Sequence, residues 1–231
     1  MKKRLDFYTG KLTLQQIVAG MNAASRNARR LFADAQTLFN AGTYPSSAAL
    51  AILSIEEAGK ISILRELSLS SNEKEIAEVW KRYRSHGSKN SQWILSELVA
   101  KGARSLDDLR PIYDTESDHP YVLDQVKQIS FYTDCLGKAH WSEPAEVIDK
   151  NLAKTLLIIA SVHSDHSDIT IQELELWVKH LGPVWKSTDS AMKEALIHWY
   201  ADMQRHGLKP QGRNDMEHFI RFGVRNSTER A

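Results

Sequence analysis

The segment from Lys81 to Lys89 gathers the residue types that proton transfer at a phosphate needs. It holds four cations and His86 within nine residues. A histidine titrates near neutral pH and can take or give a proton, while an arginine offers a planar fork of donors that fits phosphate oxygens. In-line cleavage of RNA uses both: a base removes the 2′-hydroxyl proton, and cations stabilise the charge that builds on the phosphate. That scheme needs no metal ion.

The same residues, Arg82, Arg84, His86 and Lys89, also fit a purely structural interpretation. Positive side chains near the C-terminal end of a helix complement the negative end of its macrodipole. Judged by chemistry alone, this structural interpretation is the stronger one. The choice therefore depends on what surrounds the segment.

A second group of charges, Glu56, Glu57 and Lys60, interrupts an apolar stretch that begins at Ala48. Glu56 and Lys60 are four residues apart and share one face of a helix. At a surface such a pair contributes about 0.3 kcal/mol. The stretch is so apolar, however, that we expect some of these charges near the core, where a charge needs a partner or a shifted pKa. The pattern favours a buried structural cluster over a catalytic acid.

A metal centre is a third candidate. His163, Asp165 and His166, together with Glu56 and Glu57, are the residue types that a di-metal site in a helical bundle uses. Such sites place Glu-x-x-His motifs on two helices, and neither core helix of this sequence carries one. We therefore expect neither a metal ion nor another cofactor.

Cys135 could serve as a nucleophile with His140, five residues further on. A single cysteine beside Phe131 and Leu136 is more often a packing residue, and we interpret it so. Tryptophans can stack on nucleic-acid bases, but here they recur at helical spacing to aliphatic residues. Their pattern favours packing in a core or an interface.

Helices must position all of these residues, because apolar side chains recur at three- and four-residue steps along most of the chain. Thr13 fits an N-cap, Gly42 a helix end and Pro45 a first helical turn. His86-Gly87 is expected to break or kink the third helix, and 102–120 to form a loop or short helix. No convincing strand alternation appears. The expected helices span about 14–41, 44–69, 73–85, 121–136, 144–163, 170–181, 188–206 and 213–222.

The pattern predicts an all-α protein: an antiparallel helical bundle over residues 1–167, followed by a C-terminal helical extension over 168–231. The length of 231 residues suits one large core with such an extension. The sequence pattern changes at about residue 170, where shorter predicted helices alternate with breaks that contain Gly and Pro.

Charge and composition add further expectations. The net charge is +1, but residues 1–30 carry seven lysines and arginines against one acid, and residues 81–104 carry six against one. Such segments suit either a local site for an anionic ligand or solvated helix faces. One cysteine allows no intrachain disulfide and favours the cytoplasm. Neither a membrane span nor a secretory signal is expected.

Several motifs together resemble one known family. Tyr44-Pro45 precedes an apolar helix with the element Glu-Glu-x-Gly-Lys at residues 56–60, and the basic segment 86–89 follows Trp80. Residues 131–134 and 141–144 read Phe-Tyr-Thr-Asp and Trp-Ser-Glu-Pro. These features resemble the AbiV group of abortive-infection proteins, within the HEPN superfamily, over about residues 10–165.

The resemblance implies a HEPN-like helical bundle that forms a homodimer. Many HEPN proteins are metal-independent ribonucleases whose Arg and His, with four to six residues between them, meet their symmetry mates at the dimer interface. Proteins of AbiV type resemble toxin-like effectors that stop phage propagation, with translation as the affected process. The implied partners are RNA and a phage protein as trigger, but no DNA and no membrane.

Carried onto this sequence, the resemblance makes His86 the general acid or base. Arg82 or Arg84 would bind the scissile phosphate. The implied supporting residues are Lys81, Lys89 and Asn90 at the RNA, and Glu56, Glu57 and Lys60 behind the cluster. Two alternatives remain: a non-catalytic module that binds RNA or protein in a phage-defence complex, and a metal-dependent bundle enzyme.

Overall fold

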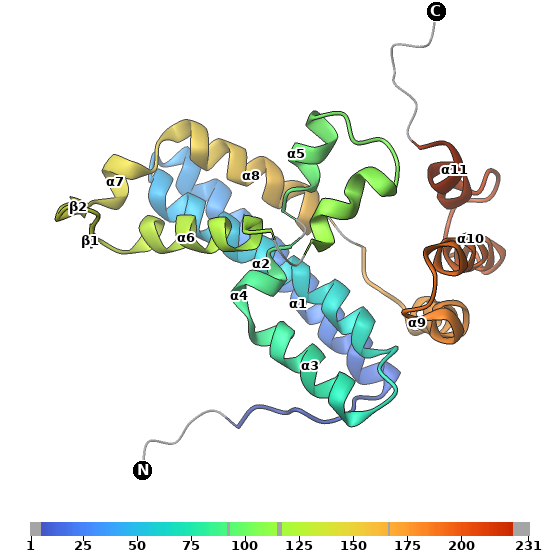
Figure 1. The fold of residues 1–231 in the computed structure, drawn as a ribbon. Coiled ribbons are helices and arrows are strands. Elements are labelled where there is room, and N and C mark those ends of the chain that lie inside the picture. Colours follow the sequence, from blue (N-terminus) through green and yellow to red (C-terminus); the bar gives the residue numbers. More distant parts are fainter. Residues whose placement is uncertain (1–5, 92, 115–116, 166, 224–231) are drawn as a thin grey trace, which may run out of the picture.

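The computed structural model describes residues 6–91, 93–114, 117–165 and 167–223. The predicted all-α class is confirmed, with one small β-hairpin added (Figure 1). The elements are α1 (Leu14–Asn40), α2 (Tyr44–Leu67), α3 (Glu73–Arg84), α4 (His86–Lys89), α5 (Leu95–Ala100), η1 (Asp107–Tyr113), α6 (His119–Phe131), β1 (Asp134–Leu136), β2 (His140–Ser142), α7 (Pro144–Val147), α8 (Lys150–Ser164), α9 (Ile171–Leu181), η2 (Gly182–Val184), α10 (Asp189–Arg205) and α11 (Asp215–Phe222).

Helix α2 lies at the centre of the bundle. This position explains why its side chains are apolar on almost every face. It runs back along α1 after a turn at Gly42, whose φ of 79° suits glycine. The hydroxyls of Ser47 and Ser54 donate to the carbonyl oxygens of Ala35 and Ala28 on α1, at 2.8 and 2.7 Å. Helices α6 and α8 pack on α2 as well (Figure 1), so its buried charges meet several elements.

The chain turns sharply between α3 and α4. Helix α3 ends at Arg84, and its C-cap Ser85 has extended backbone angles and a hydroxyl that accepts a hydrogen bond from the Ser88 N–H. His86 is therefore the first residue of a new short helix. The predicted break is confirmed, but it lies at Ser85, one residue before His86-Gly87.

The predicted helix over residues 121–136 ends five residues early, at Phe131. Residues 134–136 instead pair antiparallel with residues 140–142. The turn between these strands has positive φ at Gly137 and Ala139, a local geometry that helical periodicity does not reveal. Cys135 lies exposed in this hairpin, so its interpretation as a packing residue was wrong.

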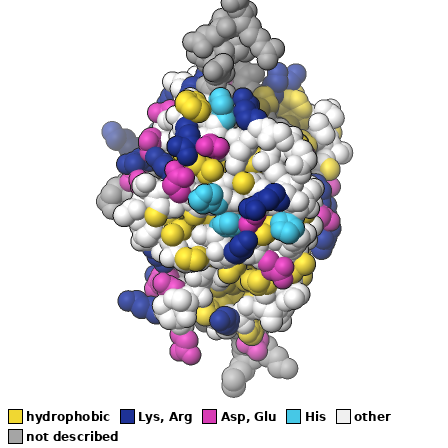
Figure 2. All heavy atoms as spheres, turned by 90° about the vertical axis from the view of Figure 1, so that its right-hand side faces the viewer, with side chains coloured by type: hydrophobic (Ala, Val, Ile, Leu, Met, Phe, Trp, Pro, Cys, Tyr) yellow, Lys and Arg dark blue, Asp and Glu magenta, His cyan; other side chains and the backbone are white. Residues whose placement is uncertain are grey.

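The C-terminal helices α9, α10 and α11 lie side by side on one side of the molecule (Figure 1). Buried Asp202 on α10 joins α9 and α10 by accepting from Lys179 and His180, and the Lys179 hydrogen bond is the main reason that its pKa falls to about 2. Positive and negative side chains are interspersed over this face (Figure 2). Among the described residues, this face therefore carries no surface of a single charge sign of the kind that attracts a long polyanion.

The extension also packs on the bundle. Asn22 of α1 exchanges two hydrogen bonds with the backbone of Ile169, and Arg65 of α2 pairs with Glu173 of α9 at 3.0 Å. The division at residues 167 and 168 stays a prediction. Among the helices within the described ranges, none combines the length and the hydropathy that crossing a bilayer requires.

Candidate functional site

Glu56 is the centre of a buried charge cluster. Its side chain is 3% exposed and receives three nitrogen donors from two other elements. Its Oε2 lies 2.7 Å from His86 Nδ1 and 3.6 Å from Lys89 Nζ, both on α4. Its Oε1 lies 2.6 Å from Lys127 Nζ on α6. One acid on the central helix thus holds α4 and α6 together.

His86 is the exposed member of this cluster, since 55% of its side chain is accessible. An ionised carboxylate only accepts hydrogen bonds, so the contact with Glu56 places the proton of a neutral ring on Nδ1. Nε2 then carries the lone pair, and it makes no hydrogen bond to any residue in the described ranges. This arrangement presents a solvent-reachable base whose ring a buried acid orients.

Lys127 lies at the back of the cluster, with its side chain 6% exposed. Its ammonium is 2.6 Å from Glu56, 2.7 Å from Asp124 and 3.2 Å from His86 Nδ1. Burial lowers the pKa of Lys127, but the hydrogen bonds to Asp124 and Glu56 outweigh burial, so the pKa lies above its ordinary value. Lys127 is therefore a fixed internal cation that pairs with both acids.

Lys89 is held less tightly. Burial lowers its pKa from the ordinary value, and Lys60 adds to the effect, while the attraction of Glu56 opposes it. At 3.6 Å, its contact with Glu56 is longer than that of Lys127. Of the two lysines, Lys89 is the one whose charge would gain most from an incoming anion.

The structure does not bring the two arginines to His86 within one subunit. Arg82 pairs with Glu66 at 2.5 Å. The Arg84 guanidinium donates to the carbonyl oxygen of Tyr8 and lies 5.2 Å and 5.1 Å from the ring centroids of Phe7 and Trp80. Neither guanidinium contacts His86 among the described residues, so the role of both arginines at a phosphate stays a prediction.

The other predicted site residues differ in their surroundings. Lys60 pairs with Glu57 at 2.5 Å and lies over the Tyr83 ring, beside the cluster rather than in it. Lys81 is exposed on α3. Asn90 is completely buried, and neither polar atom of its side chain has a partner among the described residues. A contact between Asn90 and RNA would require α4 to move.

The sequence interpretation missed Lys127 and Asp124, although a signal was present. Leu123, Lys127 and Ser130 are spaced at four and three residues and are all buried, so they form the inner face of α6. A lysine on that face needs a carboxylate partner. Asp124, three residues before Lys127, is one of its two carboxylate partners.

Glu56, His86 and Asp124 also place potential metal-ligand atoms within 4.8 Å of one another. The ammonium of Lys127 lies within 3.2 Å of an atom of each of them and already supplies a positive charge there. These residues therefore fit an internal lysine better than a divalent ion. His166, part of the other metal candidate, lies outside the described residues.

Arg213 and His218, after the bundle, also form an Arg–His pair with four residues between them. Arg213 donates to Asp215 at 3.0 and 3.1 Å, and Asn214 between them caps α11. The His218 ring packs 5.4 Å from that of Phe222. These contacts give the pair a structural explanation.

Gly59 permits the close approach of α4 to α2. A Cβ at position 59 would lie 2.0 Å from the carbonyl oxygen of Lys89, a backbone atom that moves only if α4 moves. In the element Glu-Glu-x-Gly-Lys, the first glutamate contacts His86, and the glycine leaves room for α4, the helix that carries His86.

We expect Gly59→Ala to lower the free energy of unfolding by about 1–3 kcal/mol, because overpacking displaces α4, and to reduce any activity that depends on His86. Urea denaturation and an activity assay measure the two effects. Gly87→Ala is the control within α4, since its Cβ would meet nothing nearer than Pro120 Cβ at 3.9 Å. Equal losses in both variants would refute the role of the close approach.

Comparison with known proteins gives one family match. The model of the HEPN family described as AbiV matches residues 16–164, which is more than half of the chain. The matched part runs from α1 to the end of α8 and contains the cluster around Glu56, whereas α9, α10 and α11 follow it. No curated protein and no solved structure matches the chain.

Proposed function

This chain belongs to the AbiV family of HEPN proteins, and from that premise we propose that it is an antiphage effector that cleaves RNA without a metal ion and so halts translation. Membership in the family supports a role in abortive infection. The RNA substrate, the phage protein as trigger and the cytoplasmic location are parts of the proposal. The observation that carries it is the exposed imidazole of His86, held by buried Glu56.

In this scheme Nε2 of His86 removes the proton from a ribose 2′-hydroxyl. The 2′-oxygen attacks the adjacent phosphorus, and the bond to the 5′-oxygen breaks as that oxygen takes a proton from a solvent water molecule, while the proton on His86 returns to solvent. The products are a 2′,3′-cyclic phosphate and a 5′-hydroxyl end. Glu56 keeps the Nδ1–H tautomer and stabilises the imidazolium, as a buried carboxylate does for catalytic histidines.

Lys89 is the cation that this scheme places at the phosphate. It belongs to the same short helix as His86, and an anion would offset the burial that lowers its pKa. Lys127 is already paired with two acids and acts as a positioning residue through Glu56.

Arg82 and Arg84 enter the proposal through a second copy of the chain. Their side chains contact Glu66 and Tyr8 rather than His86 of their own subunit, so the proposal has them act on the imidazole of the partner across a two-fold axis. Exposed Tyr121 and Phe131 on α6, the helix that carries Lys127, and Tyr132 directly after it supply apolar surface for such a homodimer.

Incubation of the purified protein with ribosomal, transfer and messenger RNA in EDTA tests the proposal. We expect fragments that end in a 2′,3′-cyclic phosphate and a 5′-hydroxyl. Intact RNA after incubation, together with salt-sensitive RNA binding, would favour the non-catalytic binding module instead. The positions of Arg82 and Arg84 away from His86 are the observation in favour of that second function.

A further inference from the structure

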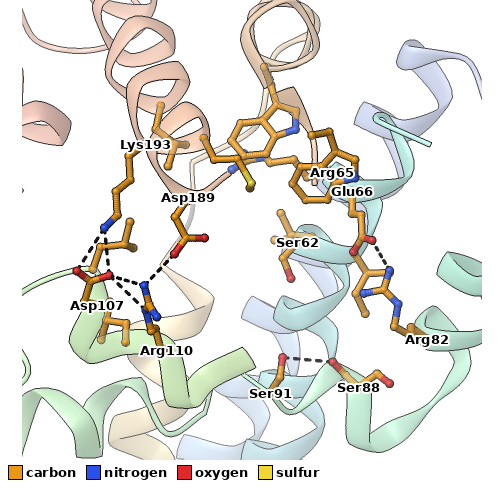
Figure 3. A pocket seen from close by; sticks show the side chains of 18 of the residues that line it. Ser62, Arg65, Glu66, Arg82, Ser88, Ser91, Asp107, Arg110, Asp189 and Lys193 are labelled. Atoms are coloured by element: carbon orange, nitrogen blue, oxygen red, sulfur yellow. Dashed lines mark hydrogen bonds and ion pairs between the residues drawn. The ribbon is translucent and has the colours of Figure 1, made fainter. Parts of the chain in front are cut away.

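A cavity of about 740 Å³ lies between the bundle and the C-terminal helices, and Glu56, His86 and Lys127 are not part of its wall (Figure 3). Residues of α2, α3, α4, η1, α9 and α10 line it. Its volume falls in the range of small-molecule sites, about 300–1,000 Å³. Its walls are largely apolar and include the indoles of Trp177 and Trp185. The cavity therefore has the size and the lining for a ligand with a flat ring.

Charged groups stand on opposite walls of this cavity (Figure 3). On one wall Arg110 contacts Asp189 at 2.8 Å and Asp107 at 3.2 Å, and Lys193 contacts Asp107 at 3.1 Å. On the other wall Arg82 pairs with Glu66. With Arg65 included, the lining carries four cations against three acids. Arg65 also pairs with Glu173, outside the lining, so each of the four cations has an acid partner and the charge count alone favours neither sign of ligand.

Arg65 is the least satisfied of the four cations. Burial lowers its pKa, and the attraction of Glu173 opposes that effect. Its Nε–H is buried without a hydrogen-bond partner among the described residues, and its guanidinium lies 5.3 Å from the Trp177 ring centroid. A nearby anion would offset the cost of burying this charge.

We propose that the cavity binds a nucleotide, with the base against the indole rings and the phosphate toward the guanidinium groups. Aromatic rings offer a stacking surface to any base, and guanidinium groups suit phosphate oxygens. The source is either a free mononucleotide or an unpaired nucleotide of an RNA strand. The second source rests on the proposed RNA activity, whereas the first does not.

Occupancy of the cavity would act on the helix that carries His86. Ser88 of α4 and Arg82 near the end of α3 both line the cavity, while His86 lies between them in the sequence. Ser91 follows α4 and donates to the Ser88 carbonyl oxygen (Figure 3). A ligand that displaced Arg82 or Ser88 would therefore shift the start of α4.

Isothermal titration calorimetry of the full chain with AMP, GMP, CMP and UMP tests this site. The His86→Ala background separates binding from cleavage, so failure of one proposal leaves the other intact. We expect micromolar dissociation constants for at least one nucleotide, and at least about tenfold weaker binding of its nucleoside and of inorganic phosphate. Tighter binding of a short RNA oligonucleotide than of the mononucleotide would identify the RNA strand as the source.

Leu196→Trp places a larger side chain in the cavity from α10. We expect it to weaken nucleotide binding at least about tenfold. Glu194→Gln, two residues earlier on the same helix and outside the cavity lining, should leave binding unchanged. Circular dichroism verifies that both variants are folded. Absence of binding at millimolar nucleotide, or equal binding by Leu196→Trp and the parent protein, overturns the proposal.

Discussion

His86→Ala is expected to lower RNA cleavage by about 10²- to 10⁴-fold, the usual contribution of a general acid or base. The variant removes the imidazole whose Nε2 takes the 2′-hydroxyl proton in the proposed reaction. It should remain folded, because the side chain is half-exposed and its one close acid, Glu56, keeps Lys127 as a partner. Initial rates on a defined RNA measure the change, and toxicity on expression in cells should fall in parallel.

His140→Ala is the matched control for that experiment. His140 is an exposed histidine on strand β2, outside the Glu56 cluster, so its loss should leave cleavage unchanged. If His86→Ala retains full activity while folded, His86 has no part in the reaction.

The proposed dimer can be tested with two inactive variants. If Arg82 serves the partner's imidazole, mixing His86→Ala subunits with Arg82→Ala subunits should restore part of the activity, because some mixed dimers contain one intact site. Each variant alone should be inactive. Full activity of Arg82→Ala by itself would remove Arg82 from the site and leave Lys89 as the phosphate ligand.

Glu56→Gln is expected to lower the free energy of unfolding by about 3–5 kcal/mol, because removal of one partner leaves a buried charge uncompensated. Buried Lys89 loses the carboxylate that it pairs with, while Lys127 loses one of its two acids and keeps Asp124. Cleavage should fall as well, since the His86 ring loses the acceptor that sets its tautomer. Urea denaturation followed by circular dichroism measures the stability.

Glu57→Gln is the control on the adjacent residue. Glu57 pairs with Lys60 at the edge of the cluster, with its side chain 19% exposed, so the expected loss is about 1 kcal/mol or less. A Glu56→Leu/Lys127→Met double variant should regain only part of the stability, because it removes this buried pair but takes Glu56 from Lys89 and Lys127 from Asp124. If Glu56→Gln costs no more than Glu57→Gln, the cluster does not support the fold.

Local sequence patterns were enough to locate most helices. The spacing of apolar residues identified α1, α2 and the C-terminal helices to within a few residues, because helix formation depends on near neighbours along the chain. The apolar stretch also indicated that some of the charges among Glu56, Glu57 and Lys60 lie near the core, and in the structure Glu56 is 2% exposed. The same reasoning failed at residues 134–136, where the β-turn after Cys135 outweighs helical periodicity.

By itself, the sequence indicated that a charge within an apolar helix needs a partner or a shifted pKa, and that the third helix breaks or kinks at His86-Gly87. Only the tertiary structure decided which cations are the partners of Glu56. Lys127 reaches Glu56 across 71 residues of chain, and the nearer Arg82 turns to Glu66. The physical reason is that the need for a counter-charge is a local property of one residue, whereas the identity of the partner depends on where helices cross. Here the crossing of α4 and α2 depends on the missing side chain of Gly59.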